Sequence, residues 1–180
     1  MNAEELFEKH AAMVYNLALR LSGNAADAQD IAQDAFLRAI RGLADFREGS
    51  AAATWLYRIT VNVWKNRVRS EKRRSFWKTF SLDRDKDEES GTPVLQIASP
   101  EPPADAALEK ADEKEILEKA LAALHPEDRA ILVMREIDGR SYEEIAVITE
   151  LQLGTVKSRI SRAREELRQK LGALVQDNGT

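Results

Sequence analysis

Basic and amide side chains recur at helical spacing between residues 58 and 74. Arg58, Asn62, Lys65 and Arg69 are separated by four, three and four residues, so a helix places them on one face. Seven Lys or Arg residues and one acid occur in this range. Cations hold nucleic-acid phosphates, and an Asn among them can read adenine edges. The stripe predicts a nucleic-acid face, with a solvated surface as the alternative, and its candidate contacts are Arg58, Asn62, Lys65, Asn66, Arg69 and Arg73.

A second basic group begins the last predicted helix, at about residues 154–171. Six Lys or Arg residues and two acids lie between 157 and 170. Cations and backbone amides at a helix start meet phosphate, while short polar side chains reach base edges. A helical hairpin of mixed charge is the alternative interpretation. The candidate DNA contacts here are Thr155, Lys157, Ser158, Arg159 and Arg162.

Acidic residues mark one face of the second predicted helix. Asp27, Asp30 and Asp34 recur at intervals of three and four, beside Gln33 and one turn before Leu37. The helix dipole favours an acid in the first turn, such as Asp27, but it does not account for Asp34. Because acids repel DNA, this face suits a protein partner, and a solvated helix face is the alternative.

Residues suited to catalysis or metal binding are scarce. The two histidines, His10 and His125, fall in different predicted domains, and neither has a nearby nucleophile, acid pair or second ligand. His125 precedes Pro126 at a helix junction, which favours a structural role. There is no cysteine to form a disulfide or a thiolate ligand. We predict no catalytic residue, metal or cofactor, no small-molecule substrate, and therefore no enzyme.

Composition favours a soluble, cytoplasmic protein that does not insert into the membrane. No run approaches the roughly 20 apolar residues that a spanning helix needs. The acidic start lacks the basic-then-apolar order of a signal peptide. The net charge of -4 does not exclude DNA binding, because residues 1–75 hold twelve basic and nine acidic residues while residues 76–110 hold four and eight.

Helical periodicity positions these groups and predicts an all-α fold. One side of the second helix is an apolar row: Ala28, Ile31, Ala32, Ala35, Phe36, Ala39 and Ile40. The third helix, expected from about Ala51 to Arg69 with Ser50 as its cap, is apolar except for the basic stripe. Residues 76–104 break the pattern with charged and Pro-rich sequence.

We interpret this break as a flexible acidic linker between two small helical domains, with a surface loop as the alternative. The predicted division is a domain at 1–75, a linker at 76–107, a domain at 108–173 and a tail at 174–180. In the second domain, Ser141 and Glu144 form a predicted capping box, followed by a short helix to about Thr149. The last helix then presents an inward row of Val156, Ile160, Ala163 and Leu167, which together give a helix-turn-helix layout over 142–167.

Three segments, in this order, resemble the extracytoplasmic-function (ECF, group 4) sigma factors of the sigma-70 family. They are residues 27–36, residues 54–62, and residues 141–146 together with 154–164. The resemblance covers about residues 3–75 and 108–171, and it implies an RNA polymerase sigma factor with a region 2 bundle and a region 4 helix-turn-helix.

The resemblance also implies partners and residue roles. Core polymerase would meet Asp30, Gln33, Asp34 and Leu37. The melted minus-ten element would meet Arg58, Asn62 and Lys65, residues 47–54 would capture a flipped base, and the minus-thirty-five element would meet Thr155, Lys157, Ser158, Arg159 and Arg162. The acidic linker would thread towards the polymerase active site. Members of the family are typically held inactive by an anti-sigma factor, often membrane-anchored.

Two departures from the family pattern stand out. Where the family usually has Leu-Gly in the helix-turn-helix turn, this chain has Thr149-Glu150, so Glu150 is expected either to bear left-handed strain of roughly 1 kcal/mol or to adopt another turn. The capture loop contains Ala51-Ala52-Ala53, without the aromatic residue often seen near it. The runner-up interpretation, a stand-alone helix-turn-helix regulator or response-regulator output domain, explains the second domain but neither the basic stripe nor the acid face.

Overall fold

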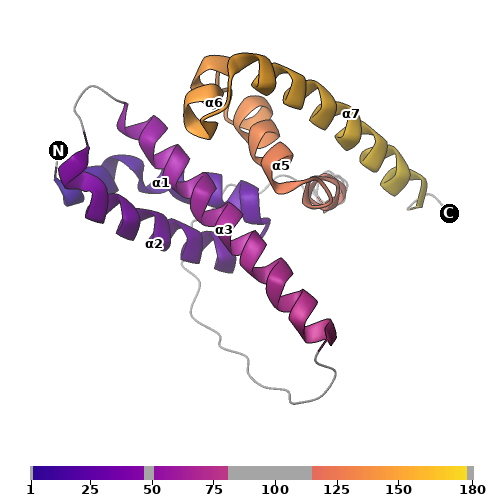
Figure 1. The fold of residues 1–180 in the computed structure, drawn as a ribbon, viewed down its shortest axis with the longest axis horizontal. Coiled ribbons are helices and arrows are strands. Elements are labelled where there is room, and N and C mark those ends of the chain that lie inside the picture. Colours follow the sequence, from indigo (N-terminus) through magenta and orange to yellow (C-terminus); the bar gives the residue numbers. More distant parts are fainter. Residues whose placement is uncertain (1, 47–50, 81–114, 178–180) are drawn as a thin grey trace, which may run out of the picture.

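The computed structural model describes residues 2–46, 51–80 and 115–177, and every element assigned in these ranges is helical, which confirms the predicted all-α fold (Figure 1). The predicted linker beyond residue 80 and residues 47–50 of the predicted capture loop, including the proposed cap Ser50, lie outside the described residues. The elements are α1 (Ala3–Ser22), α2 (Ala25–Gly42), the 3-10 turn η1 (Leu43–Asp45), α3 (Ala52–Phe80), a helix at 115–122, α5 (Pro126–Leu132), the π-helix η2 (Val133–Ile137), α6 (Tyr142–Thr149) and α7 (Leu153–Asp177).

Caps at both ends of α1 set up the first helical hairpin. The Asn2 side chain accepts from the Glu5 backbone N–H at 2.8 Å, and the Glu5 carboxylate accepts from the Asn2 N–H at 3.3 Å. Gly23 ends α1 in the left-handed conformation (φ 81°), which glycine adopts without steric cost. Asn24 then caps α2 by accepting from the Asp27 N–H at 2.8 Å. The chain therefore reverses within two residues, and α1 packs along α2.

The first domain is a bundle of α1, α2 and α3 around an apolar core. Leu17, Leu21, Ile31 and Leu56 are almost completely buried where the three helices meet. Thr60 is buried among them and donates its hydroxyl to the Leu56 carbonyl at 2.8 Å, so it leaves no unpaired polar group. Helix α3 is thus buried over most of its circumference, as its sequence predicted.

Helix α3 is longer than predicted. It continues to Phe80 rather than ending near Arg69, and so runs into the stretch assigned to the linker. Residues 70–80 contain neither Gly nor Pro, and Arg67 pairs with Glu71 one turn later at 3.3 Å, so nothing in the sequence ends the helix. Its last turns project away from the bundle (Figure 1). Helix α7 likewise extends beyond its expected end, to Asp177.

The second domain packs α5, η2 and α6 against α7. The His125 ring accepts from the Glu127 N–H at 3.4 Å and so caps α5, which confirms the structural role expected for this histidine. The predicted capping box begins α6, where Ser141 accepts from the Glu144 N–H at 3.0 Å and the Glu144 carboxylate accepts in return at 2.8 Å. The predicted inward row of α7 faces the core, with Val156, Ile160 and Ala163 buried and Leu167 packed beside them.

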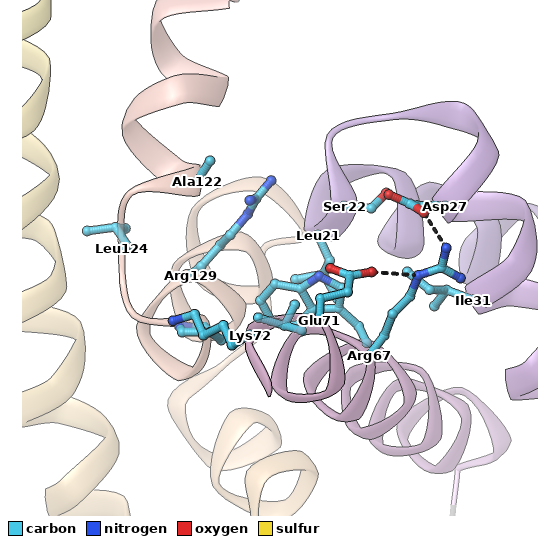
Figure 2. Close-up of a pocket in the computed structure, with 13 residues that line it drawn as sticks. Leu21, Ser22, Asp27, Ile31, Arg67, Glu71, Lys72, Ala122, Leu124 and Arg129 are labelled. Atoms are coloured by element: carbon cyan, nitrogen blue, oxygen red, sulfur yellow. Dashed lines mark hydrogen bonds and ion pairs between the residues drawn. The ribbon is translucent and has the colours of Figure 1, made fainter. Parts of the chain in front are cut away.

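The two domains lie against each other, and a small pocket of about 210 Å³ separates them on one side (Figure 2). Arg129, from α5, reaches into this region and is 7% exposed. Its guanidinium donates to the Arg20 carbonyl at 3.2 Å and lies 5.9 Å from the centre of the Trp64 ring. One buried cation of the second domain is therefore held by the backbone and an aromatic ring of the first.

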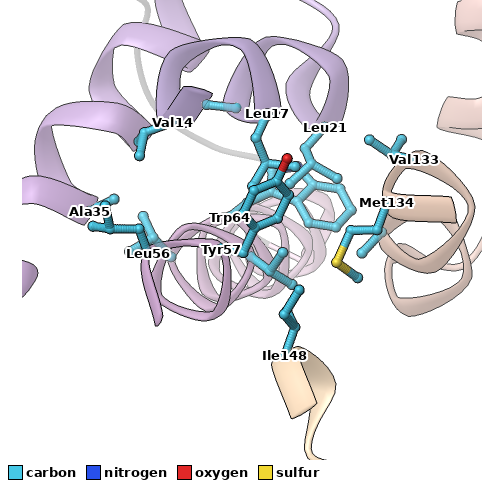
Figure 3. Close-up of a cluster of buried hydrophobic side chains, with 14 of the residues drawn as sticks. Val14, Leu17, Leu21, Ala35, Leu56, Tyr57, Trp64, Val133, Met134 and Ile148 are labelled. Atoms are coloured by element: carbon cyan, nitrogen blue, oxygen red, sulfur yellow. The ribbon is translucent and has the colours of Figure 1, made fainter. Parts of the chain in front are cut away.

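Beside this pocket the apolar cores of the two domains are continuous. Figure 3 shows Val133, Met134 and Ile148 of the second domain facing Tyr57 and Trp64 on α3. All five side chains are at most 4% exposed. The same buried cluster runs from α1 to α7, so the interface between the domains is packed like an interior.

No helix in the described ranges is both long enough and apolar enough to cross a membrane.

Candidate nucleic-acid and protein interfaces

Helix α3 presents the predicted basic and amide stripe on its polar side. Asn62, Asn66, Arg69 and Arg73 are exposed, while Arg58 and Lys65 are partly covered. The flanking residues Leu56, Tyr57, Thr60, Val61, Val63 and Trp64 are buried. The stripe is therefore held on a rigid helix by the core behind it, as a surface that reads DNA requires.

Carboxylates of the second domain cover part of this stripe. Arg58 pairs with Glu150 at 3.1 Å, measured from Nη1 to Oε1. Glu127 accepts from Lys65 at 3.1 Å and lies 3.6 Å from Arg69. Three of the six candidate contacts are thus ion-paired across the domain interface in the described part of the chain.

Glu150 adopts the left-handed backbone conformation, which is the first of the two outcomes expected from the sequence, the other being a different turn. Its φ and ψ are 58° and 31°, and it is the only residue other than glycine with positive φ in the described ranges. Its backbone N–H donates to the Ala146 carbonyl and ends α6. The turn between α6 and α7 therefore keeps a backbone that glycine would favour, at a cost of about 1 kcal/mol for a residue with a Cβ.

The start of α7 exposes most of the second predicted set of DNA contacts. Lys157, Ser158 and Arg162 are exposed, and Thr155 is half-buried. The Ser158 hydroxyl donates to the Thr155 carbonyl at 3.0 Å, a bond that base contact would replace. Arg159 instead turns back towards α5, where it pairs with Glu127.

One face of α2 gathers all four residues predicted to meet a protein partner. Asp30, Gln33, Asp34 and Leu37 are all exposed there, and Leu37 has 45% of its surface in water. Ile40, the last residue of the apolar row on this helix, is also 47% exposed, one turn further along. Apolar spacing alone could not separate these positions, because the row of core residues is adjacent to the exposed face on the helical wheel.

Phe7, an exposed apolar residue that the sequence did not single out, lies close to α2. Phe7 on α1 is 54% exposed and meets the Phe36 ring edge-on, with ring centres 5.0 Å apart. Phe7 thus extends the apolar surface of this region from α2 onto α1. Exposed aromatic and aliphatic groups beside acids are typical of a surface that binds another protein.

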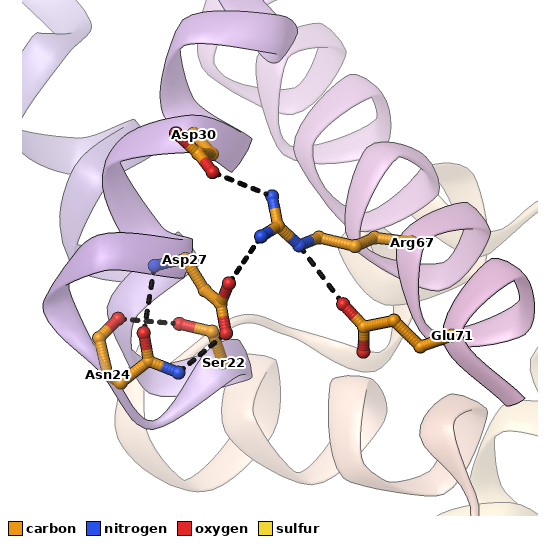
Figure 4. A network of polar contacts seen from close by, with 6 residues as sticks. All are labelled: Ser22, Asn24, Asp27, Asp30, Arg67 and Glu71. Carbon is orange, nitrogen blue, oxygen red and sulfur yellow. Dashed lines mark hydrogen bonds and ion pairs between the residues drawn. The ribbon is translucent and has the colours of Figure 1, made fainter. Parts of the chain in front are cut away.

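Arg67 neutralises part of the acidic face, which the sequence did not predict. Figure 4 shows its guanidinium between Asp27 and Asp30 of α2 and Glu71 of its own helix. The bonds to Asp30 and Glu71 measure 3.1 and 3.3 Å. Asp27 and Asp30 therefore hold α2 against α3, whereas Asp34 forms no ion pair with any of the described residues.

A second polar cluster joins the domains at Asp138. Asp138 lies mostly buried and pairs with Arg20 at the end of α1. Arg140 stacks over the Tyr57 ring at 4.3 Å and pairs with Glu144 at 2.8 Å. Burial raises the pKa of Asp138, although Arg20 opposes the effect.

Within the described residues there is no group of three His, Cys, Asp or Glu side chains placed to hold a metal ion. His10 is half-buried on α1, and burial followed by the neighbouring Lys9 lowers its pKa. The charged side chains instead form two basic faces, on α3 and at the start of α7, and one acidic and apolar face on α2.

Comparison with known proteins matches both halves of the chain. Sigma-70 region 2 matches residues 6–74, and Sigma-70 region 4 matches residues 114–167. The ECF RNA polymerase sigma factor SigE of Mycolicibacterium smegmatis is 38% identical over 165 residues, which span 92% of this chain and 60% of that protein. The ECF RNA polymerase sigma-E factor of Escherichia coli K12 is 38% identical over 149 residues, 83% of this chain and 76% of that protein.

A solved structure agrees with these matches. The sigma factor RpoE in complex with the anti-sigma factor NepR, from Bartonella quintana, has a TM-score of 0.62 and 26% identity, covering 94% of this chain and 96% of that one. The chain therefore belongs to the sigma-70 family, and within it to the ECF RNA polymerase sigma factors.

Proposed function

We propose that the chain binds core RNA polymerase and directs it to a particular set of promoters. The observation that carries this proposal is that one chain holds two separate basic faces, on α3 and at the start of α7, together with an acidic and apolar face on α2. Family membership supports the same division of labour.

Each face is proposed to have one role. The exposed face of α2 docks on core polymerase through Asp30, Gln33, Asp34 and Leu37, and Ile40 extends it. The stripe on α3 engages the melted minus-ten element through Arg58, Asn62, Lys65, Asn66, Arg69 and Arg73. The start of α7 enters the major groove at the minus-thirty-five element through Thr155, Lys157, Ser158, Arg159 and Arg162.

Regulation by an anti-sigma factor is part of the proposal. The related Bartonella quintana protein was solved in complex with such a factor, NepR. In this proposal the chain works in the cytoplasm with polymerase, and a partner, membrane-anchored as in part of the family, withholds it until a signal arrives. Co-purification of the chain with an inhibitory protein, and loss of that protein on induction, would support this control.

Run-off transcription with purified core enzyme tests the central proposal. On a library of random promoter sequences, the chain should programme core enzyme to start at a shared pair of elements. A stand-alone helix-turn-helix regulator would bind duplex DNA unaided and would give no initiation with core enzyme. That second result would overturn the proposal.

Replacement of one amide tests the role of the stripe. Asn62 is exposed and its side chain forms no hydrogen bond with any of the described residues, so Asn62→Ala removes base readout without disturbing the fold. We expect open-complex formation to fall roughly tenfold, the effect of one lost base contact. Core binding should stay unchanged, and Asn16→Ala, an exposed amide on α1, should affect neither. An equal loss of core binding and open complexes would show that Asn62 is structural.

A further inference from the structure

Among the described residues, the ion pairs between the two domains share one polarity. In each of them a cation of the first domain meets a carboxylate of the second: Arg20 with Asp138, Arg58 with Glu150, and both Lys65 and Arg69 with Glu127. Three of these cations, Arg58, Lys65 and Arg69, belong to the stripe proposed to hold the minus-ten element. The second domain thus supplies to the stripe the negative charge that DNA would supply.

Glu127 is the point at which both candidate DNA faces meet. Its Oε1 lies 3.1 Å from Lys65 Nζ and 3.6 Å from Arg69 Nη2, both on α3. Its Oε2 accepts from Arg159, a proposed minus-thirty-five contact on α7. The carboxylate sits in the first turn of α5, behind the His125 cap, and only 27% of its side chain is exposed. The Glu127 carboxylate is therefore paired with cations of both candidate DNA faces at the same time.

These contacts compete with DNA engagement. The Glu127 carboxylate neutralises part of the charge of Lys65, Arg69 and Arg159 and draws these side chains towards itself, so a DNA phosphate competes with the carboxylate for the same cations. Access is also restricted, because Lys65, Arg159 and Glu127 line a small pocket between the domains and only 23%, 24% and 27% of their side chains are exposed. Parting of the domains would free Lys65 and Arg159 for promoter DNA.

We infer that Glu127 latches the free chain in a closed form, in which one carboxylate stands in for DNA phosphate at both readers. The inference rests on the proposed DNA-binding roles and adds how those sites are kept silent before polymerase and promoter engage them. The buried contact of Met134 with Trp64 holds the closed form independently of charge, whereas the latch weakens as salt screens it. On opening, the cations exchange the Glu127 carboxylate for DNA phosphate. Because only the open form binds DNA, the apparent DNA affinity of the chain is the affinity of the open form multiplied by the fraction of chains that are open.

The sharpest test compares two carboxylate replacements in the full chain. Glu127→Gln removes the latch but keeps the size of the side chain. Glu136→Gln is the matched control, since Glu136 pairs with Arg164, which like Arg159 lies on α7, at 2.7 Å and with no described residue of the first domain. Because the chain has no cysteine, labels can be placed at Ala12→Cys on α1 and Ala173→Cys on α7, both exposed. Distances between the labels then report opening.

The closed form predicts a short distance between the labels in the unsubstituted chain and a longer, broader distribution in Glu127→Gln. Binding of a promoter duplex without polymerase should tighten roughly fivefold to tenfold in Glu127→Gln, as the open fraction rises. Glu136→Gln should match the unsubstituted chain in both measurements. Identical distances in Glu127→Gln and the unsubstituted chain, or equal changes in both variants, would overturn the inference.

A second variant keeps the test decisive if Glu127→Gln disturbs α5. The pair Lys65→Gln and Arg69→Gln removes the same interdomain bonds from exposed or partly exposed positions of α3, and the label distance should lengthen in the same way. This readout needs neither DNA nor polymerase. A chain that closes as described but fails in run-off transcription would therefore contradict the proposed function while leaving the latch in place.

Discussion

Glu150 combines an unfavourable backbone conformation with an interdomain ion pair. The left-handed backbone costs a residue with a Cβ about 1 kcal/mol relative to glycine. The pair with Arg58 contributes little in return, because 72% of the Glu150 side chain is exposed. Substitutions of Glu150 can therefore measure the cost of the left-handed backbone separately from the contribution of the ion pair.

Replacing Glu150 in two ways measures these requirements. Glu150→Gln removes the ion pair and keeps the strain, whereas Glu150→Gly removes both. We expect Glu150→Gly to have the larger free energy of unfolding of the two by about 1 kcal/mol, measured by urea unfolding followed by circular dichroism. Ser161→Gly, inside α7 and exposed, should instead destabilise the chain by roughly 0.5–1 kcal/mol. If the two Glu150 variants are equally stable, the turn carries no such strain.

The Glu127 carboxylate is surrounded by cations from α3 and α7. The hydrogen bond from Arg159 is the main cause that holds its pKa at about 2, below the ordinary 4.5, with Lys65 adding to it against the opposing effect of burial. Because this pKa is lower in the folded chain than in the unfolded one, ionised Glu127 contributes stability above about pH 4.5. That contribution is lost as the pH falls towards 2.

This pH dependence can be isolated by difference. The free energy of unfolding of the unsubstituted chain should exceed that of Glu127→Gln near neutral pH, and the gap should close between pH 4.5 and 2. Asp138 has the opposite sign, since its pKa is raised, but it is present in both proteins and cancels. Urea unfolding at a series of pH values measures the gap, and a gap independent of pH would contradict this account of Glu127.

Helix α2 has two apolar sides that differ in their exposure to solvent. Ala28, Ile31 and Ala35 are buried against α1 and α3, whereas Leu37 and Ile40 remain in water beside Asp34. While no partner covers α2, these two aliphatic side chains contribute no free energy of burial. Their placement next to the acids is explained if a partner covers them.

Truncating these two residues tests the docking face. The double variant Leu37→Ala, Ile40→Ala should weaken binding to core polymerase by at least tenfold, because buried apolar anchors dominate such interfaces. Its thermal stability should change little, since both side chains are already exposed. Val175→Ala on α7, which truncates an aliphatic side chain that is 58% exposed, is the control. Unchanged core binding in the double variant, measured by native gel shift of the polymerase, would exclude this face.

Local features of the helices could be predicted from the sequence because their causes are local. The capping box at Ser141 and the inward row from Val156 to Leu167 each depend on residues within a few turns. The end of α3 could not be placed, since the polar residues after Arg69 remain good helix formers. The exposure of Ile40 could not be predicted either, because apolar periodicity does not distinguish a buried residue from an apolar residue on an uncovered face.

The arrangement of the whole molecule lay beyond sequence reasoning for a different reason. Arg58 and Glu150 are 92 residues apart, and Arg20 and Asp138 are 118 apart. Nothing in their local sequence distinguishes these charges from solvated ones. The role of Arg67 was not predicted for the same reason, because the acids it pairs with lie on another helix. Which cation meets which acid is fixed only when the folded elements are brought together.

The continuous apolar core also makes the two domains one cooperative unit. Because Met134 and Trp64 share a dry contact, the unbound chain should unfold in a single thermal transition rather than one for each domain. Opening exposes that contact to water, so a partner that engages both readers must supply the lost free energy from its own interface. The affinity of the chain for polymerase is therefore set partly by how tightly the chain holds itself.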